Sequence, residues 1–345
     1  MQRLAILKTG GYTLPLVDSV ELLAFLESPK DAKWLLEKTG INAHSLNFNP
    51  ATGKKITNEN SLDYAEHAAR EALENLNIDS WLIDHLCLAT CTPANLHFSG
   101  DAIELHRRLG LRPDAAIDQV DGGCAALAKA FQLIQVYANA STKQKHYALI
   151  VATNDVASFI DKYRYRANRG DDAWLSPAIF ADGAGAMILG SWPLENYLRG
   201  TYAAVNGDHP LVSYKGGGAA DPTNLYNVNE HAYVMDSKDV ALQFMPAMER
   251  VVNYFLGKFY LKIEDIQRWY LHQANFRFLE KFSQVYHIPM EKIPHNVDRL
   301  GNTVSASTLL LLDEDIKNGN FPKEGPVLFL FVGAGMMEGG ALFLK

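Results

Sequence analysis

Short apolar runs bounded by Gly, Pro, Asp or Asn alternate along the chain with segments of helical period, and this alternation most constrains the fold. Apolar residues between Ala65 and Leu76 recur in steps of three and one, which places them on one face of a helix. A second helix is predicted after Cys124, because Leu127, Phe131 and Ile134 follow the same period. The predicted strands are His85–Ala89, Tyr147–Ala152, Ala184–Leu189, Trp269–His272 and Val327–Val332. Alternating strands and helices indicate an α/β protein built in layers.

Composition narrows the possible partners and compartment. The 345 residues are 48% hydrophobic and 21% charged, as in a globular protein of one large domain or two intimate halves. The net charge is −7 and no basic run stands out, so we expect no nucleic-acid partner. The start of the chain lacks a secretory signal core, and no apolar run reaches membrane length, so we expect a cytoplasmic protein without membrane insertion. Three cysteines at these spacings fit neither a disulfide framework nor a zinc site, and no metal is expected.

Cys124 is the first candidate for chemistry, because it follows Asp121-Gly122-Gly123 and opens a predicted helix. The two glycines permit a sharp turn and the close approach of a ligand, and the positive end of a helix favours a thiolate. A buried, inert cysteine is the alternative, and it is the interpretation we give to Cys87 and Cys91. The local sequence does not decide between the two interpretations of Cys124.

Three further segments could complete a site. His272 ends the apolar run Trp269–Leu271, and α/β enzymes place catalytic groups at strand ends, although most single histidines lie satisfied in a core. The polar loop 301–307 leads into a predicted helix over residues 308–316, and Ser305 or Ser307 could simply cap it. The glycines of segment 333–335 end a strand, where their N–H groups could face an oxyanion or merely form a turn.

Taken in order, five segments resemble the landmark segments of β-ketoacyl-ACP synthase III, a branch of the thiolase-fold condensing enzymes. They are Asp121-Gly-Gly-Cys124-Ala, Phe180-Ala-Asp-Gly-Ala-Gly-Ala186, His272-Gln-Ala-Asn275-Phe-Arg277, Gly301-Asn302-Thr303 and Gly333-Ala-Gly335. The resemblance runs over essentially the whole chain, and the His-Gln-Ala-Asn and Gly-Asn-Thr segments are its most specific markers. It implies the thiolase fold, a layered αβαβα sandwich of two structurally similar halves. Residues 1–190 would carry the nucleophilic cysteine, and residues 191–345 would carry the histidine and the asparagine.

The resemblance assigns a catalytic triad to Cys124, His272 and Asn302, with the backbone N–H groups of Cys124 and Ala334 as the oxyanion hole. An acyl-Cys124 thioester would form from acyl-ACP or acyl-CoA. Condensation with a malonyl-type or β-keto thioester would follow, with His272 and Asn302 stabilising the enolate. No permanently bound cofactor is implied, since the carrier is the phosphopantetheine of acyl carrier protein or coenzyme A.

The resemblance also suggests residues that bind the substrate and its carrier. Trp34 and Lys38 fall in the family's Trp…Arg-Thr-Gly-Ile segment, and Arg277 lies where the family places a basic contact for carrier protein or CoA. Asn275 would support the site from behind. Phe98 occupies the position from which a phenylalanine enters the acyl pocket of the partner subunit, which implies a homodimer, although a plain core phenylalanine is the competing interpretation.

Departures from the family pattern leave alternatives open. Gly122-Gly123 replaces the usual Ala-Ala pair, and Met337-Glu338-Gly339 replaces Thr-Trp-Gly, which favours specialised fatty-acid or polyketide-type biosynthesis. The enzyme could instead pass the acyl group to an alcohol or amine without decarboxylation. Papain-like proteases share the triad order but flank their cysteine differently, and an intact triad argues against a non-catalytic subunit.

Overall fold

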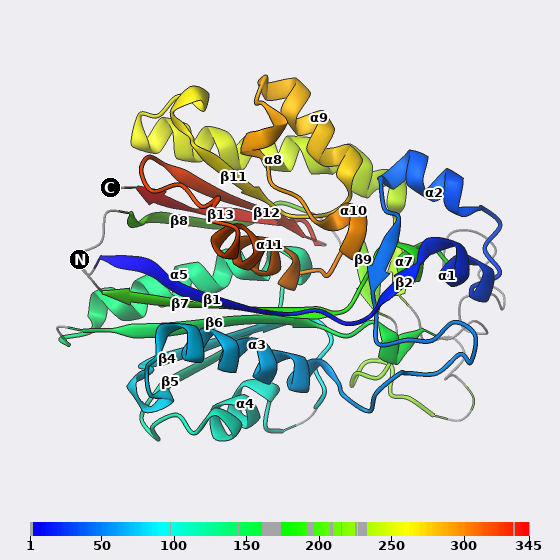
Figure 1. Ribbon diagram of the computed structural model, residues 1–345, viewed down its shortest axis with the longest axis horizontal. Helices are drawn as coiled ribbons and strands as arrows, with labels where there is room; N and C mark the ends of the chain where they lie inside the picture. The colour runs from blue at the N-terminus through cyan, green and yellow to red at the C-terminus, as the bar shows by residue number, and fades with distance from the viewer. Residues whose placement is uncertain are drawn as a thin grey trace.

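Five layers, helices alternating with two sheets, make up the fold (Figure 1). The computed structural model describes residues 3–96, 98–143, 145–160, 174–191, 196–207, 210–214, 216–224, 226, 233–333 and 335–344. The first sheet has the order β1-β7-β6-β4-β5. Its strands are β1 (Leu4–Tyr12), β4 (His85–Thr90), β5 (Ala116–Val120), β6 (Tyr147–Asn154) and β7 (Gly183–Ser191). The parallel pairs β4/β5 and β4/β6 lie at one side of this sheet, and antiparallel pairs join β7 to β6 and β1.

The second sheet has the order β11-β12-β13-β8. Its strands are β8 (Tyr197–Val205), β11 (Arg268–Leu271), β12 (Val327–Gly333) and β13 (Met337–Leu344). Strands β11 and β12 are parallel, and the other two pairs are antiparallel. All strands of the first sheet precede residue 192 and all those of the second follow residue 196. The division into halves at residue 190 itself stays a prediction.

Helices α5 (Ala126–Ala140) and α11 (Ala306–Lys317) form the layer between the sheets (Figure 1). Each contacts both sheets, α5 through β4 and β13 and α11 through β7 and β11. Helices α3 (Ser61–Leu76) and α4 (Asp101–Leu109) cover the outer face of the first sheet, and α8 (Ser237–Phe259) and α9 (Phe276–Tyr286) cover the second. The predicted αβαβα layering is therefore confirmed.

The five predicted strands and the predicted helices are all present, most of them longer than predicted, although β11 ends at Leu271 and leaves His272 just beyond it. Of the two large sheets, strands β1, β5, β8 and β13 were not predicted, and β1 shows why. It runs through Gly10-Gly11, which look like a turn in the sequence. A Cβ at Gly10 would lie 2.3 Å from the Ala68 carbonyl oxygen, so this glycine serves the close approach of α3 to the strand.

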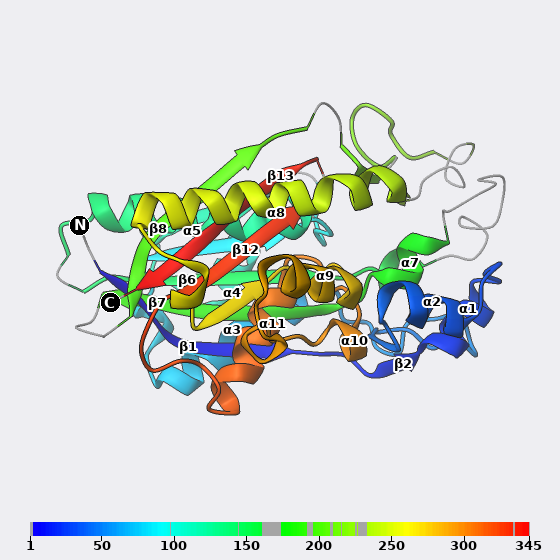
Figure 2. The same ribbon diagram turned by 90° about the horizontal axis from the view of Figure 1, so that it is seen from above.

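A group of short elements lies at one end of the sandwich in both views (Figures 1 and 2). It contains α1 (Ser19–Phe25), α2 (Ala32–Thr39), α7 (Leu175–Ile179), α10 (Val297–Leu300) and the two-stranded sheets β2 (Leu16–Asp18) with β3 (Ala43–Ser45) and β9 (Val212–Tyr214) with β10 (Tyr233–Met235). Strands β4 and β6 end beside this group, immediately before or at residues that line a cavity. In the described part of the chain, no helix combines the length and apolar character needed to cross a membrane.

Candidate active site

One cavity of about 530 Å³ brings Cys124, His272 and Asn302 together. Cys124 lies in the short 3₁₀ turn Gly123–Ala125 that leads into α5, His272 directly follows β11, and Asn302 lies between α10 and α11. The remaining wall is mostly apolar, with side chains such as Val156, Phe244 and Phe278. Residues from both sheets and their connecting segments therefore meet at one reactive space.

The turn that carries Cys124 depends on its two glycines. Gly122 has φ 148° and Gly123 has φ 53°, both in the region that favours glycine. The Asp121 carboxylate accepts the N–H groups of Gly122 at 2.6 Å and Gly123 at 3.3 Å, which fixes the turn. A Cβ on Gly122 would lie 2.7 Å from the Met337 sulfur, so the two departures from the family pattern noted in the sequence are complementary in space.

The Cys124 thiol is neutral at physiological pH. Burial raises its pKa to about 12, and a hydrogen bond with Asn302 opposes this rise. The sequence had suggested that the start of the helix would favour a thiolate, but desolvation outweighs that effect. Acylation therefore needs the proton to leave as the carbon–sulfur bond forms.

Asn302 is oriented by hydrogen bonds of its backbone and by one from the Val304 N–H to its side chain. Its N–H donates to the Ile179 carbonyl at 3.0 Å, and its carbonyl accepts from the Ala181 N–H at 2.9 Å. The Val304 N–H donates to Asn302 Oδ1 at 2.9 Å, across a turn in which Val304 has φ 53°. A β-branched residue rarely adopts this φ, so the turn is strained. The amide oxygen is thereby occupied and the Nδ2 donor faces the cavity and the thiol.

His272 is an uncharged imidazole in the cavity wall. The residue is 2% exposed, and its backbone N–H donates to the Leu330 carbonyl at 2.8 Å, which continues the hydrogen bonding of β11 with β12 by one residue. Burial lowers the pKa of His272 to about 3. Its Nδ1 atom has no hydrogen-bond partner among the described residues. A neutral ring has one N–H, which it can donate to a ligand.

Asn275 and Arg277 begin α9 but have different surroundings. Asn275 lines the cavity, and its side chain caps α9 by accepting the Phe278 N–H at 3.0 Å. The Arg277 guanidinium lies outside the cavity lining and donates to the carbonyls of Leu36 at 3.1 Å and Glu37 at 3.0 Å, in the last turn of α2. In this structure Arg277 therefore ties α2 to α9.

The other predicted binding residues do not line the cavity. The Trp34 ring lies 5.8 Å from that of Trp174, and Lys38 is exposed in the last turn of α2. Phe98 is fully exposed and has φ 64°, so it is not a core phenylalanine. Ala334 lies outside the described residues.

Sequence reasoning missed polar residues in the cavity wall. Asn154 and Cys91 both line the cavity, and the Cys91 thiol lies 3.6 Å from Asn154 Oδ1. Burial raises the pKa of Cys91 as it does that of Cys124, and the inert character of Cys91 stays a prediction. Their positions in the sequence could have indicated a place in the site, because each residue is at or just beyond the end of a buried strand. Within the described ranges, no three His, Cys, Asp or Glu side chains are grouped to hold a metal ion.

Comparisons with known proteins agree with this geometry. Residues 256–344 match the family described as 3-oxoacyl-[acyl-carrier-protein (ACP)] synthase III C terminal. A β-ketoacyl-[acyl-carrier-protein] synthase III from Methylococcus capsulatus is 29% identical over 334 residues, covering 97% of this chain and 96% of the relative. The enzyme of the same name from Rhodospirillum centenum is 27% identical, covering 99% and 98%. Over nearly its whole length the chain is similar to β-ketoacyl-ACP synthase III, a condensing enzyme of the thiolase fold.

Solved structures place this synthase III-like enzyme in the same fold. The 3-oxoacyl-(acyl carrier protein) synthase III of Pseudomonas aeruginosa aligns with a TM-score of 0.82 at 22% identity, over 99% of this chain and 98% of its own. OleA of Xanthomonas campestris, solved with bound lauric acid and lauroyl-CoA, aligns with a TM-score of 0.83 at 18% identity, over 100% and 99%. At these identities the likeness establishes the fold alone.

Proposed function

We propose that the enzyme forms an acyl thioester on Cys124 and condenses the acyl group with a malonyl-type thioester. The observation that carries this proposal is the single cavity in which a thiol meets two uncharged donors, Asn302 and His272. A thiol supplies the nucleophile, and uncharged donors in a desolvated site stabilise developing negative charge.

In the first step Cys124 sulfur attacks the carbonyl carbon of an acyl thioester. The bond from that carbon to the carrier sulfur then breaks, and the carrier leaves as a thiol with the proton that Cys124 gave up. The N–H groups of Cys124 and Ala334 are proposed to hold the tetrahedral oxyanion. The high pKa of Cys124 suits this order, because the thiol loses its proton only while it reacts.

In the second step the malonyl-type thioester loses carbon dioxide, and its carbonyl oxygen becomes an enolate. Asn302 Nδ2 and the His272 N–H are proposed to donate to that oxygen. The enolate carbon attacks the acyl-Cys124 carbonyl, a carbon–carbon bond forms, and Cys124 is released. Burial of both donors strengthens their hydrogen bonds to a charged oxygen.

Transfer of the acyl group to an alcohol or amine is the less favoured chemistry. It needs a base that takes a proton from the acceptor, and a histidine with a pKa of about 3 is a weak base. The same neutral ring is well suited to donate a hydrogen bond to an enolate. The electrostatics of His272 therefore favour condensation.

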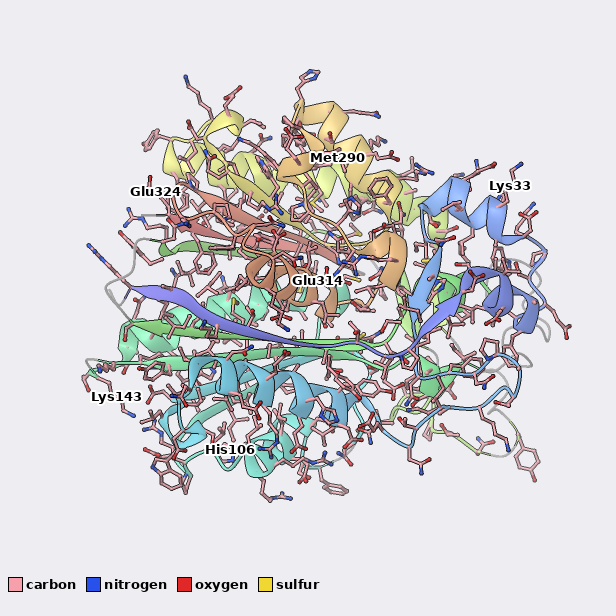
Figure 3. The ribbon with its side chains drawn as sticks, viewed as in Figure 1. Lys33, His106, Lys143, Met290, Glu314 and Glu324 are labelled. Carbon is pink, nitrogen blue, oxygen red and sulfur yellow. The ribbon has the colours of Figure 1, made fainter. Side chains whose placement is uncertain are left out.

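The carrier is proposed to be acyl carrier protein or coenzyme A, arriving beside α2. This helix and the segment before it present Trp34 and three lysines, Lys30, Lys33 and Lys38, and Figure 3 shows Lys33 on the outer side of the molecule. Lysines attract the phosphate of a phosphopantetheine or nucleotide. The acyl group and the pathway remain proposals, with specialised fatty-acid or polyketide-type biosynthesis suggested by the Gly122–Met337 pairing.

We propose a homodimer across the edge of the first sheet. In the described chain β5 pairs only with β4, which leaves its other edge open, and open edges invite pairing. Leu96 and Phe98, in the segment before α4, are both strongly exposed. Sedimentation of the purified protein should give twice the mass of one chain, and a monomer at micromolar concentration would rule this arrangement out.

The test of function uses donors and an acceptor in sequence. Incubation with a panel of acyl-CoA and acyl-ACP donors should add an acyl mass to the Cys124 peptide, and Cys124→Ala should abolish it. Malonyl thioester should then give a β-ketoacyl product and carbon dioxide. Asn302→Ala and His272→Ala should still acylate but condense at least about a hundredfold more slowly. Absence of an adduct from every donor would reject the proposal.

A further inference from the structure

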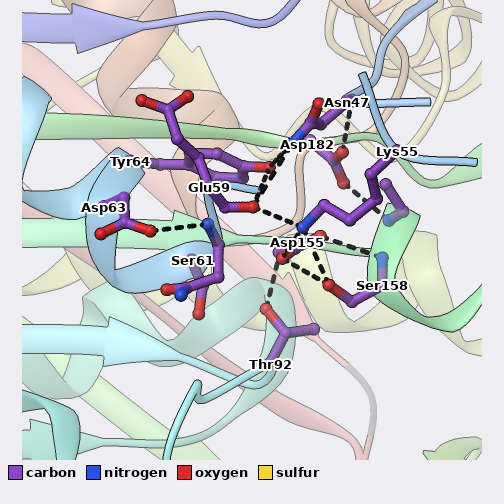
Figure 4. Close-up of polar contacts among 12 residues, drawn as sticks. Asn47, Lys55, Glu59, Ser61, Asp63, Tyr64, Thr92, Asp155, Ser158 and Asp182 are labelled. Carbon is purple, nitrogen blue, oxygen red and sulfur yellow. Dashed lines mark hydrogen bonds and ion pairs between the residues drawn. The ribbon is translucent and has the colours of Figure 1, made fainter. Parts of the chain in front are cut away.

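Asp182 is a fully buried carboxylate that lies behind the cavity, between α7 and β7. Its Oδ1 atom accepts the N–H groups of Val156 at 2.6 Å and Ala157 at 3.1 Å. Its Oδ2 atom accepts the Asn47 N–H at 2.8 Å. Three backbone donors from two distant segments thus converge on one side chain, within the network drawn in Figure 4.

The first of these segments is part of the cavity wall. Val156 lines the cavity, and the Asn154 side chain in the same segment donates from Nδ2 to the Ala181 carbonyl at 3.0 Å. Ala181 in turn donates its N–H to the Asn302 carbonyl. The backbone that ends at Asp182 is therefore the backbone against which Asn302 is fixed.

The second segment, residues 44–47, also contacts the residues around Asn302. The Asp182 N–H donates to the Ser45 carbonyl at 2.7 Å, two residues before Asn47. His44 packs on Gly301, where an added Cβ would lie 2.9 Å from the imidazole and 3.0 Å from the Ala181 Cβ. Movement of residues 44–47 would therefore displace Gly301 and Asn302.

The surroundings of Asp182 act on its charge in opposite directions. Burial and then the negative charge of Asp155 raise the pKa of Asp182 above its ordinary value, while its backbone hydrogen bonds oppose the rise. Lys55 Nζ lies 3.0 Å from Asp155 Oδ2 and offsets that second carboxylate. The ionisable groups around Asp182 are Asp155, Lys55, Tyr64, Glu59 and, on β3, His44.

We propose that Asp182 is a positioning residue for condensation: its carboxylate holds segments 44–47 and 154–157 against 179–182 and so keeps the Asn302 carboxamide aimed at Cys124. An ionised carboxylate has two acceptor oxygens and no proton of its own, which suits a group that receives three N–H donors. The inference rests on the proposed function, because its effect appears in the enolate step that Asn302 serves.

The experiment compares acylation and condensation in Asp182→Asn. The amide oxygen can still accept from Val156 and Ala157, but the amide nitrogen cannot accept from Asn47, so the support of Asn302 is lost selectively. Acylation of Cys124 should stay within about twofold of wild type, whereas condensation should fall at least about tenfold, as small misplacements of reacting groups cause. An equal loss in both steps, or no loss in either, would overturn the proposal.

Asp84→Asn is the matched control. Asp84 is also a buried carboxylate that accepts a backbone N–H, from Tyr147 at 2.8 Å, but it lies at the opposite end of β4 and β6. The ratio of condensation to acylation should not change in this variant. If wild-type enzyme acylates Cys124 yet gives no β-ketoacyl product, the proposed function fails before any variant is compared.

Lys55→Met provides a second test that keeps Asp182 itself and changes a side chain that is 25% exposed. Without Lys55 the charge of Asp155 is uncompensated, so the pKa of Asp182 should rise further. The condensation-to-acylation ratio should increase with pH in wild type, increase only at a higher pH in Lys55→Met, and not change with pH in Asp182→Asn. Coincident profiles for wild type and Lys55→Met would contradict the proposal even if Asp182→Asn fails to fold.

Discussion

Replacement of Gly333 by alanine should slow the acylation of Cys124 by displacing the turn that carries this residue. Gly333 ends β12 and lines the cavity, directly against the turn that carries Cys124. An added Cβ would lie 2.6 Å from both the Ala125 nitrogen and the Gly122 oxygen. Both atoms belong to the backbone, so no side chain can rotate away.

The size of the effect follows from these contacts. Ordinary van der Waals contact begins near 3.4 Å, so the end of β12 and the turn must separate by about 0.8 Å. Overpacking of this kind costs about 1–3 kcal/mol of folding free energy. A shift near 1 Å at reacting groups can cost about a hundredfold in rate. Gly333→Ala should therefore remain folded but acylate Cys124 roughly 10 to 100 times more slowly.

Single-turnover acylation, followed by the mass of the intact protein, measures the rate, and urea unfolding measures the stability. Gly257→Ala is the control, since Gly257 lies exposed in α8 with no atom within 4 Å of the added Cβ. That change should raise stability by about 0.5–1 kcal/mol and leave acylation alone. Wild-type acylation and an unchanged urea midpoint in Gly333→Ala would refute the view that this backbone contact sets the position of Cys124.

Three further outcomes are expected. Alkylation of Cys124 by iodoacetamide should accelerate about tenfold per pH unit between pH 7 and 9, because the thiolate fraction rises in that proportion below a pKa of about 12, and a plateau near pH 8 would contradict the burial effect. Arg277→Gln should raise the KM for the thioester donor several-fold with little change in kcat, because the hydrogen bonds that join α9 to α2 are lost. Glu280→Gln removes only the ion pair with Arg277 and should leave the steady-state kinetics unchanged. Arg250→Met should lower the free energy of unfolding by about 1–3 kcal/mol in urea titrations, because it removes the charged hydrogen bonds to the buried Glu338 carboxylate. An unchanged urea midpoint would show that the remaining hydrogen bond from Asn206 is enough to stabilise this carboxylate.

The sequence predicted the layers well, because buried strands such as β6 are continuous apolar runs and helices such as α5 have a clear helical period. The triad residues were predicted by resemblance, and the structure brings them to one cavity. Partners far apart in the chain could not be predicted. Nothing in the local sequence of Asp182 shows that the Asn47 N–H donates to it. Nothing near Gly122 shows that the Met337 sulfur packs against this glycine. The pKa of Cys124 also needed the cavity, since desolvation depends on surroundings that helix position does not report.

The connection between α2 and α9 has a consequence for biosynthesis of the molecule. Arg277 donates to Leu36 across 241 positions of sequence, and Gly40 at the end of α2 leaves no room for a Cβ beside Phe276. The ribosome synthesises α2 long before α9, so the Glu37 carbonyl stays hydrated until Arg277 is made, whereas the Leu36 carbonyl already accepts the Gly40 N–H at 2.8 Å. Nascent chains that stop short of residue 277 lack this capping arginine, and α2 is then the element we expect proteases to cut first.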